Sequence, residues 1–118
     1  MMTYKETLDY LFTHLPMYQR IGAAAYKKDL TNTLALLQIL DNPQDTFTSI
    51  HIGGTNGKGS VSNMLAAVCA EAGYTTGLYT SPHLVDFRER IRVNGFLCEE
   101  EFVIKFEEKI NIKYIQRK

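Results

Sequence analysis

A glycine-rich run between a strand-forming and a helix-forming segment constrains this 118-residue chain more than any other feature. The stretch Ser49-Ile50-His51-Ile52 favours a strand and leads directly into the run, which reads Gly53-Gly54-Thr55-Asn56-Gly57-Lys58-Gly59-Ser60. Apolar residues then recur at helical spacing from about Lys58 to Ala72. Glycines let backbone N–H groups turn inward without Cβ collisions, and a new helix directs its positive end at the same point. This order of elements predicts a phosphate-binding loop.

The segment after the predicted helix completes a βαβ unit. Gly73 stands where helices commonly end on a left-handed residue, and Tyr74–Thr80 is predicted to form a second strand. Strand, helix and strand within about 30 residues favour a parallel pair joined by a right-handed crossover. We therefore predict an α/β fold in which residues 48–80 carry a P-loop on a parallel sheet with flanking helices.

A helical lead-in is predicted over residues 1–47, with a first helix at about Tyr4–His14 and a second from Asp29 to about Leu40. Thr3 and Glu6 have the spacing of a capping box at the start of the first helix. Apolar residues at helical spacing are expected to form the buried faces of the two helices. They are Leu8, Leu11, Phe12, Leu15, Leu30, Leu34, Leu37 and either Ile39 or Leu40.

A loop, a hairpin and a last helix are predicted over residues 81–118. Asn94-Gly95 supplies the positive φ angles of a tight turn between Ile91–Val93 and Phe96-Leu97. The acidic run that begins at Glu99 suits the first turn of a helix. The side chains expected to enter the core from that helix are Phe102, Phe106 and Ile110.

The composition of the chain excludes several classes of partner. Lysine and arginine number 13, as do aspartate and glutamate, so the chain has no general attraction for nucleic acid or an anionic membrane. No run approaches the roughly 18–20 apolar residues of a membrane span, and the first residues are charged, unlike a signal peptide. The two cysteines lack the spacing of a zinc site or a disulfide scaffold. A reducing, cytoplasmic setting is therefore expected.

The lysine of the glycine-rich run is the candidate cation for a nucleotide. Lys58 is expected to reach the β- and γ-phosphates, with the hydroxyl of Ser60 lying in the helix. The run departs from the common GxxxxGK[ST] motif, since Ile52 stands at its first glycine and Gly59 separates the lysine from the hydroxyl residue. A generic P-loop kinase or GTPase is therefore a poorer fit. A glycine-rich turn with an exposed lysine and no ligand is the simplest alternative.

Two blocks of this sequence resemble a known family. The block from Gly54 to Ser60 is similar to the phosphate loop of the Mur-ligase superfamily. The second block resembles the segment that marks the folate branch of that superfamily, the folylpolyglutamate and dihydrofolate synthases. It reads Thr80-Ser81-Pro82-His83-Leu84, followed by Phe87 and by Glu89-Arg90-Ile91. The similarity covers about residues 3–110, which resemble an incomplete Mur-ligase central domain.

The resemblance implies an ATP-dependent ligase that acts in folate biosynthesis and one-carbon metabolism. In such enzymes a carboxylate attacks the γ-phosphate of ATP to give an acyl phosphate, and the amine of L-glutamate then displaces phosphate. The carboxylate belongs to dihydropteroate or to a folate. Mg²⁺ is the implied metal, since the transferring phosphoryl group needs charge neutralisation. The family also implies a mostly monomeric protein with small-molecule substrates and neither nucleic acid nor membrane as partner.

The resemblance also implies roles for individual residues. Ser81 matches the magnesium-binding serine, at the carboxyl end of a predicted parallel strand where ligands gather. Its alternative role is to cap the following turn. His83 and Arg88 are candidate substrate contacts, and their alternatives are a hydrogen-bonded structural histidine and a solvated charge run. The implied ATP-phosphate contacts are Gly54, Thr55, Asn56, Gly57, Lys58, Gly59 and Ser60, of which the lysine is also catalytic.

The length of the chain limits which properties of the family can be expected of it. Proteins of this family run to several hundred residues, and much of their active site has no matching position here. We therefore expect an N-terminal portion that is inactive as a ligase alone. Two alternatives stay open. Another Mur-type amino-acid ligase would share the phosphate loop but lack the Ser81–Ile91 block, and a nucleotide-binding module would perform no catalysis.

Overall fold

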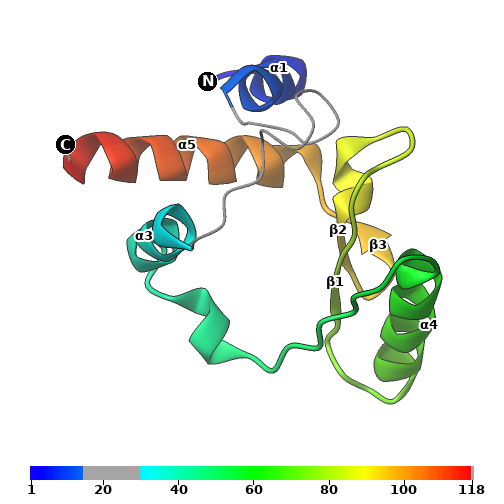
Figure 1. Ribbon diagram of the computed structural model, residues 1–118. Coiled ribbons are helices and arrows are strands. Elements are labelled where there is room, and N and C mark those ends of the chain that lie inside the picture. The colour runs from blue at the N-terminus through cyan, green and yellow to red at the C-terminus, as the bar shows by residue number, and fades with distance from the viewer. Residues whose placement is uncertain (15–29, 118) are drawn as a thin grey trace. The chain divides into compact units, whose positions relative to one another are not determined.

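The computed structural model describes residues 1–14 and 30–117. They form two compact units, one combining the N-terminal stretch up to Ser49 with the chain from Val103 onward, and the other spanning Ile50–Phe102. None of the helices in the described ranges combines the length and hydropathy that crossing a bilayer requires. The elements labelled in Figure 1 are α1 (Tyr4–His14), α3 (Thr31–Ile39), the 3-10 helix η2 (Pro43–Thr46), α4 (Lys58–Glu71), β1 (Gly77–Tyr79), the 3-10 helix η3 (Phe87–Arg90), β2 (Ile91–Val93), β3 (Phe96–Leu97) and α5 (Glu100–Arg117).

Helix α1 begins with the capping box that the sequence predicted. The backbone N–H of Thr3 donates to Glu6 Oε2 at 2.7 Å, and the Glu6 N–H donates to Thr3 Oγ1 at 3.2 Å. These bonds satisfy N–H groups that a helix start leaves without intrahelical partners, and the Thr3 N–H lowers the pKa of the Glu6 carboxyl. Thr7 is fully buried and donates its hydroxyl to the Thr3 carbonyl at 2.9 Å. The predicted bounds of α1 are confirmed.

Helix α3 confirms the second predicted helix but buries less of it than expected. Ile39 is 8% exposed, whereas Leu30 and Leu34 are 65% and 55% exposed. The predicted burial of these two leucines is wrong, because apolar spacing alone does not show whether the chain supplies a partner for the stripe. The expected helix start at Asp29 and the expected buried residue Leu15 both lie outside the described residues.

Helix α5 buries a different face from the one predicted. Val103 and Glu107 are each 5% exposed, whereas Phe102 and Phe106 are 50% and 43% exposed. The members of each pair lie four residues apart and share a face, but the two faces differ by about 100° around the helix. The prediction that the two phenylalanines enter a core is therefore wrong within the described chain.

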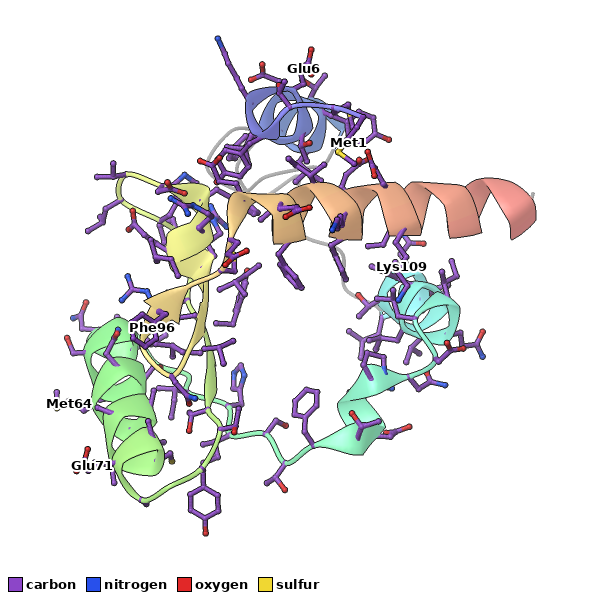
Figure 2. The ribbon with its side chains drawn as sticks, turned by 180° about the vertical axis from the view of Figure 1, so that it is seen from behind. Met1, Glu6, Met64, Glu71, Phe96 and Lys109 are labelled. Atoms are coloured by element: carbon purple, nitrogen blue, oxygen red, sulfur yellow. The ribbon has the colours of Figure 1, made fainter. Side chains whose placement is uncertain are left out.

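Helix α4 and strand β1 place the glycine-rich loop. α4 ends within one residue of its predicted end, and Gly73 has the left-handed φ of 96° expected just past a helix. A short turn then brings β1 back against α4, and the two elements run in opposite directions (Figure 1). Met64 is 64% exposed and projects from α4 (Figure 2). The loop before α4 and the loop after β1 therefore lie at the same end of this pair.

The sheet is antiparallel, which corrects the predicted parallel pair. Its strand order is β1-β2-β3, with Gly77 of β1 opposite Val93 of β2. The strand expected at Ser49–Ile52 is not formed, and Ile50 is 64% exposed. A parallel strand is stable when neighbouring strands pair with it and helices cover its faces, and the described part of the chain offers this segment no paired strand. The predicted α/β class, with helices flanking a small sheet, is confirmed, but the predicted parallel pairing is not formed in the described residues.

The β2–β3 hairpin is formed as predicted. Asn94 and Gly95 have φ angles of 51° and 85°, which are the two positive values of a type I′ turn. The backbone N–H of Asn94 donates to the Thr76 carbonyl at 2.9 Å, and its side-chain oxygen accepts from the Thr76 N–H at 2.8 Å. These bonds tie the turn to the chain that enters β1, so the hairpin fixes the end of the antiparallel sheet at which β1 begins.

We expect Gly95→Ala to lower the free energy of unfolding by about 1 kcal/mol, because alanine disfavours the positive φ at this position. Gly77→Ala is the matched control, since a Cβ at Gly77 would meet no atom within 4 Å and its φ is not positive. Its stability should stay the same or rise slightly. Urea unfolding followed by circular dichroism measures both variants, and equal destabilisation would contradict the role of the turn.

Candidate functional site

The loop before α4 turns at two glycines with unusual backbone angles. Gly54 has a φ of 151° and Gly57 a φ of 79°, values that residues with a Cβ rarely adopt. Gly57 is also the N-cap of α4, whose first helical bond runs from the Val61 N–H to the Gly57 carbonyl at 3.0 Å. The N–H groups of residues 58–60 precede that bond, so they lie at the positive end of the helix without intrahelical acceptors. Phosphates bind to helix termini of this kind.

The ammonium of Lys58 lies over the same loop. Its Nζ donates to the Gly54 carbonyl at 2.5 Å and to the Thr55 carbonyl at 3.3 Å. A lysine ammonium has three donors, so these two bonds hold the charge beside the helix end without using its full capacity. Residues 53–60 are all exposed, so a phosphate in solvent can reach both the ammonium and the backbone N–H groups.

The first turn of α4 leaves its N–H groups uncapped by side chains. Ser62 donates its hydroxyl to the Lys58 carbonyl at 2.7 Å, and Asn63 donates its amide to the Gly59 carbonyl at 2.8 Å. Both bonds end on carbonyl oxygens, and Gly57 has no side chain with which to cap the helix. Most helices begin at Ser, Thr, Asp or Asn caps that satisfy these N–H groups. All seven predicted phosphate contacts lie in this loop or in the first turn that follows it.

Ser81 is the second residue after β1, in the loop that leaves the α4–β1 pair at the end where the phosphate loop lies. The residue is exposed, and its peptide bond to Pro82 is cis. Its Oγ accepts a hydrogen bond from Arg90 Nη1 at 3.2 Å. The magnesium-binding role of Ser81 stays a prediction.

A carboxylate fixes the backbone of the loop after Ser81. Glu89 accepts three consecutive N–H bonds, from Leu84 at 3.1 Å, Val85 at 2.9 Å and Asp86 at 2.5 Å. These bonds, led by the one from the Asp86 N–H, lower the pKa of the Glu89 carboxyl. Asp86 in turn accepts from the Arg88 N–H at 2.9 Å, which completes a capping box at the start of η3. The loop is thus held by its own side chains.

His83 and Arg88, the predicted substrate contacts, both take part in the internal bonding of this loop. His83 Nδ1 accepts from Arg90 Nε at 2.8 Å, and its ring meets the Phe87 ring edge-on with centroids 5.8 Å apart. Arg88 Nη2 lies 3.0 Å from Asp86 Oδ2. The contacts of His83 match its alternative as a hydrogen-bonded structural histidine, whereas the half-buried, ion-paired Arg88 does not belong to a solvated charge run. Contact of either residue with a substrate stays a prediction.

The burial of Arg90, which belongs to the Glu89-Arg90-Ile91 block, is a feature that the sequence did not reveal. It is 7% exposed although it stands in a charged run, and its guanidinium carbon lies 5.5 Å from the centroid of the Phe87 ring. Charged runs are usually solvated, so residue types alone did not mark this arginine as buried. The available signal was its position directly before β2, where the chain turns from a loop into the sheet.

The described residues could contribute to a metal site only if a bound substrate supplied most of the ligands. Within residues 1–14 and 30–117, no group of three or more His, Cys, Asp or Glu side chains could hold a metal ion. Mg²⁺ usually keeps several waters and is bound by one or two protein oxygens together with substrate phosphates. Ser81 offers one such oxygen in the loop after β1, so the donor set would suit a Mg²⁺ ion that arrives with a nucleotide.

The chain is similar in sequence to enzymes of folate metabolism, although no family model matches it. The folylpolyglutamate synthase of Lacticaseibacillus casei is 42% identical over 93 residues, which are 79% of this chain and 20% of that protein. The probable dihydrofolate synthetase of Schizosaccharomyces pombe is 43% identical over 72 residues, 61% of this chain and 17% of that protein.

Solved structures agree with the sequence matches. A folylpolyglutamate synthetase from Lactobacillus casei superposes with a TM-score of 0.84 at 33% identity, over 98% of this chain and 27% of its own. The folylpolyglutamate synthase of Thermotoga maritima has a TM-score of 0.79 at 42% identity, over 92% of this chain and 23% of its own. A complex of folylpolyglutamate synthase with AMPPCP and folate superposes with a TM-score of 0.84 at 33% identity, over 98% of this chain and 26% of its own.

The chain spans about a fifth of the length of the curated relatives and about a quarter of the solved ones. The agreement in fold nevertheless extends over nearly all of this chain. By sequence and by fold, the chain belongs to the family of folylpolyglutamate and dihydrofolate synthases.

Proposed function

We propose that this chain forms the phosphate-binding part of an ATP-dependent ligase that joins L-glutamate to the carboxylate of a folate or dihydropteroate. The observation that carries the proposal is the convergence of the Lys58 ammonium with the open helix end at Gly57. Membership of the family supports the ligase activity. The relative solved with AMPPCP, an ATP analogue, and folate supports the two ligand classes.

Binding of a triphosphate would change the partners of the lysine. Lys58 would exchange the neutral carbonyls of Gly54 and Thr55 for phosphate oxygens, which carry full charge and make stronger hydrogen bonds. The backbone N–H groups of residues 58–60 would hold the same oxygens from the helix side. These groups are in place before the ligand arrives, so they would stabilise charge without reorganising as phosphate is transferred.

The proposed reaction proceeds through an acyl phosphate. The substrate carboxylate attacks the γ-phosphorus and ADP leaves, after which the amine of glutamate attacks the acyl carbon and inorganic phosphate leaves. Ser81 would be the residue of this chain that holds Mg²⁺, which would supply charge neutralisation on the phosphoryl group. His83 and Arg88 are proposed to face the folate from the loop after β1. A cytoplasmic setting is part of the same proposal, because the chemistry consumes ATP.

A nucleotide-binding module without turnover is the second candidate. The observation that favours it is the small share of the relatives that the chain spans, which is 20% of the Lacticaseibacillus casei protein. Such a module would keep the phosphate loop and the cation site but would release no ADP.

We expect Lys58→Ala to weaken AMPPCP binding by about 10- to 100-fold, because a lost hydrogen bond to a charged group costs roughly 1.5–3 kcal/mol. Lys5→Ala is the matched control, since Lys5 is an exposed lysine on α1, in the other compact unit. Isothermal titration calorimetry with Mg²⁺-AMPPCP measures both variants. Unchanged affinity in the Lys58 variant would exclude the proposed phosphate site.

We expect the purified 118-residue chain to bind nucleotide but to show no glutamate-dependent ADP release. The reason is that the chain matches only 20% of a relative that performs the whole reaction. A coupled assay for ADP, run with folate or dihydropteroate and with or without L-glutamate, measures this. Release of ADP that depends on glutamate would show that the chain holds a complete active site.

A further inference from the structure

We propose that Arg90 is a positioning residue, which holds the Ser81 hydroxyl and the His83 ring so that Ser81 Oγ faces a cation carried by the nucleotide. This inference rests on the proposed function, because that function gives Ser81 a cation to bind. The observation behind it is a buried guanidinium whose donors reach two side chains of the loop after β1.

Arg90 joins the two ends of that loop. Its carbonyl accepts from the Thr80 N–H at 3.2 Å. Its Nη1 donates to Ser81 Oγ at 3.2 Å, and its Nε donates to His83 Nδ1 at 2.8 Å. The residue is only 7% exposed, so these bonds replace hydration that burial has removed from the guanidinium. The backbone and the side chain of one residue therefore fix three positions at the start of the loop.

The bond from Arg90 determines where the Ser81 oxygen lies. Ser81 is exposed, and an exposed serine side chain otherwise rotates among three staggered positions. A hydroxyl accepts two hydrogen bonds and donates one, so the Arg90 N–H uses one lone pair and leaves another for a cation. An oxygen that is already fixed loses less conformational freedom when the cation binds. The charge of the guanidinium opposes a bare cation, but it attracts the triphosphate that carries the cation.

The second bond makes this role specific to arginine. Because His83 Nδ1 accepts from Arg90, a neutral His83 ring carries its proton on Nε2. A guanidinium offers Nε and Nη donors in one planar group, so it can serve the ring nitrogen and the hydroxyl together. A lysine has a single ammonium on a flexible stem and cannot reproduce this geometry. Arg90→Lys therefore keeps the charge and removes the positioning.

The rest of the loop has its own support. Glu89 holds the backbone N–H groups from Leu84 to Asp86, and Asp86 caps η3, without the Arg90 side chain. A change at Arg90 should therefore release the Ser81 and His83 side chains while the loop backbone stays in place. Arg92→Lys is the matched control on the same chain segment, because Arg92 Nε has no hydrogen-bond partner in the described structure.

The test compares AMPPCP binding with and without Mg²⁺ in the full chain, for the wild type, Arg90→Lys, Ser81→Ala and Arg92→Lys. In the wild type and in Arg92→Lys we expect Mg²⁺ to tighten binding. In Arg90→Lys the gain from Mg²⁺ should shrink by about 10-fold, as is usual when a residue that orients a metal ligand is lost. Affinity without Mg²⁺ should change little. His83→Ala keeps the buried Arg90 guanidinium and removes only the ring that it contacts. This variant should therefore reduce the gain in affinity from Mg²⁺ by a smaller factor.

The outcomes separate this inference from the proposed function. If Ser81→Ala loses the gain from Mg²⁺ while Arg90→Lys and His83→Ala keep it, the positioning role of Arg90 is wrong and the phosphate site stands. If Ser81→Ala also keeps the full gain, Ser81 is no cation ligand, and the inference fails with that part of the proposal. If the wild type binds no AMPPCP, the proposed function fails and the inference falls with it.

A measurement without nucleotide tests the positioning directly. The ¹⁵N resonances of the His83 ring report whether Nδ1 accepts a hydrogen bond. We expect them to shift in Arg90→Lys and to stay at wild-type values in Arg92→Lys. Wild-type ring resonances in Arg90→Lys would overturn the inference, whatever the nucleotide titrations show.

Discussion

The open positive end of α4 is the feature on which the rest of the site depends. Gly57 adopts a left-handed conformation at the N-cap, and as a glycine it brings no side chain to satisfy the N–H groups of the first turn. Lys58 folds back over the loop and adds a full charge to the partial charge of the helix end. The other candidate residues can contact a bound nucleotide only where the fold brings them near this helix end.

The antiparallel arrangement of α4 and β1 brings a second loop to the same end. Ser81 stands two residues after the end of β1, and the loop that contains it is fixed by two charged residues of opposite sign. Glu89 accepts from the loop backbone, whereas Arg90 donates to the loop side chains. Two loops, each held by its own contacts, thus lie at one end of the helix–strand pair, and the proposed phosphate and cation sites use one loop each.

Short-range features of the fold could be predicted from the sequence, and long-range ones could not. The capping box at Thr3, the left-handed Gly73 and the Asn94-Gly95 turn depend on residues a few positions apart, and all three were predicted correctly. The predicted parallel pairing of the strand before the glycine-rich loop was wrong, because strand pairing depends on segments that are far apart in the sequence. The burial of Arg90 was missed for the same reason, because residue types do not show which charged residue of a run is buried. The contacts of individual site residues with a nucleotide stay predictions.

Backbone amide resonances of the phosphate loop test the binding site most directly. In a ¹H–¹⁵N titration of the chain with Mg²⁺-AMPPCP, the amides of residues 57–60 should shift first and furthest, because their N–H groups would donate to phosphate oxygens. Amides of α1 should stay near their starting positions. Saturable shifts confined to other segments, with residues 57–60 unmoved, would contradict a nucleotide held at the start of α4.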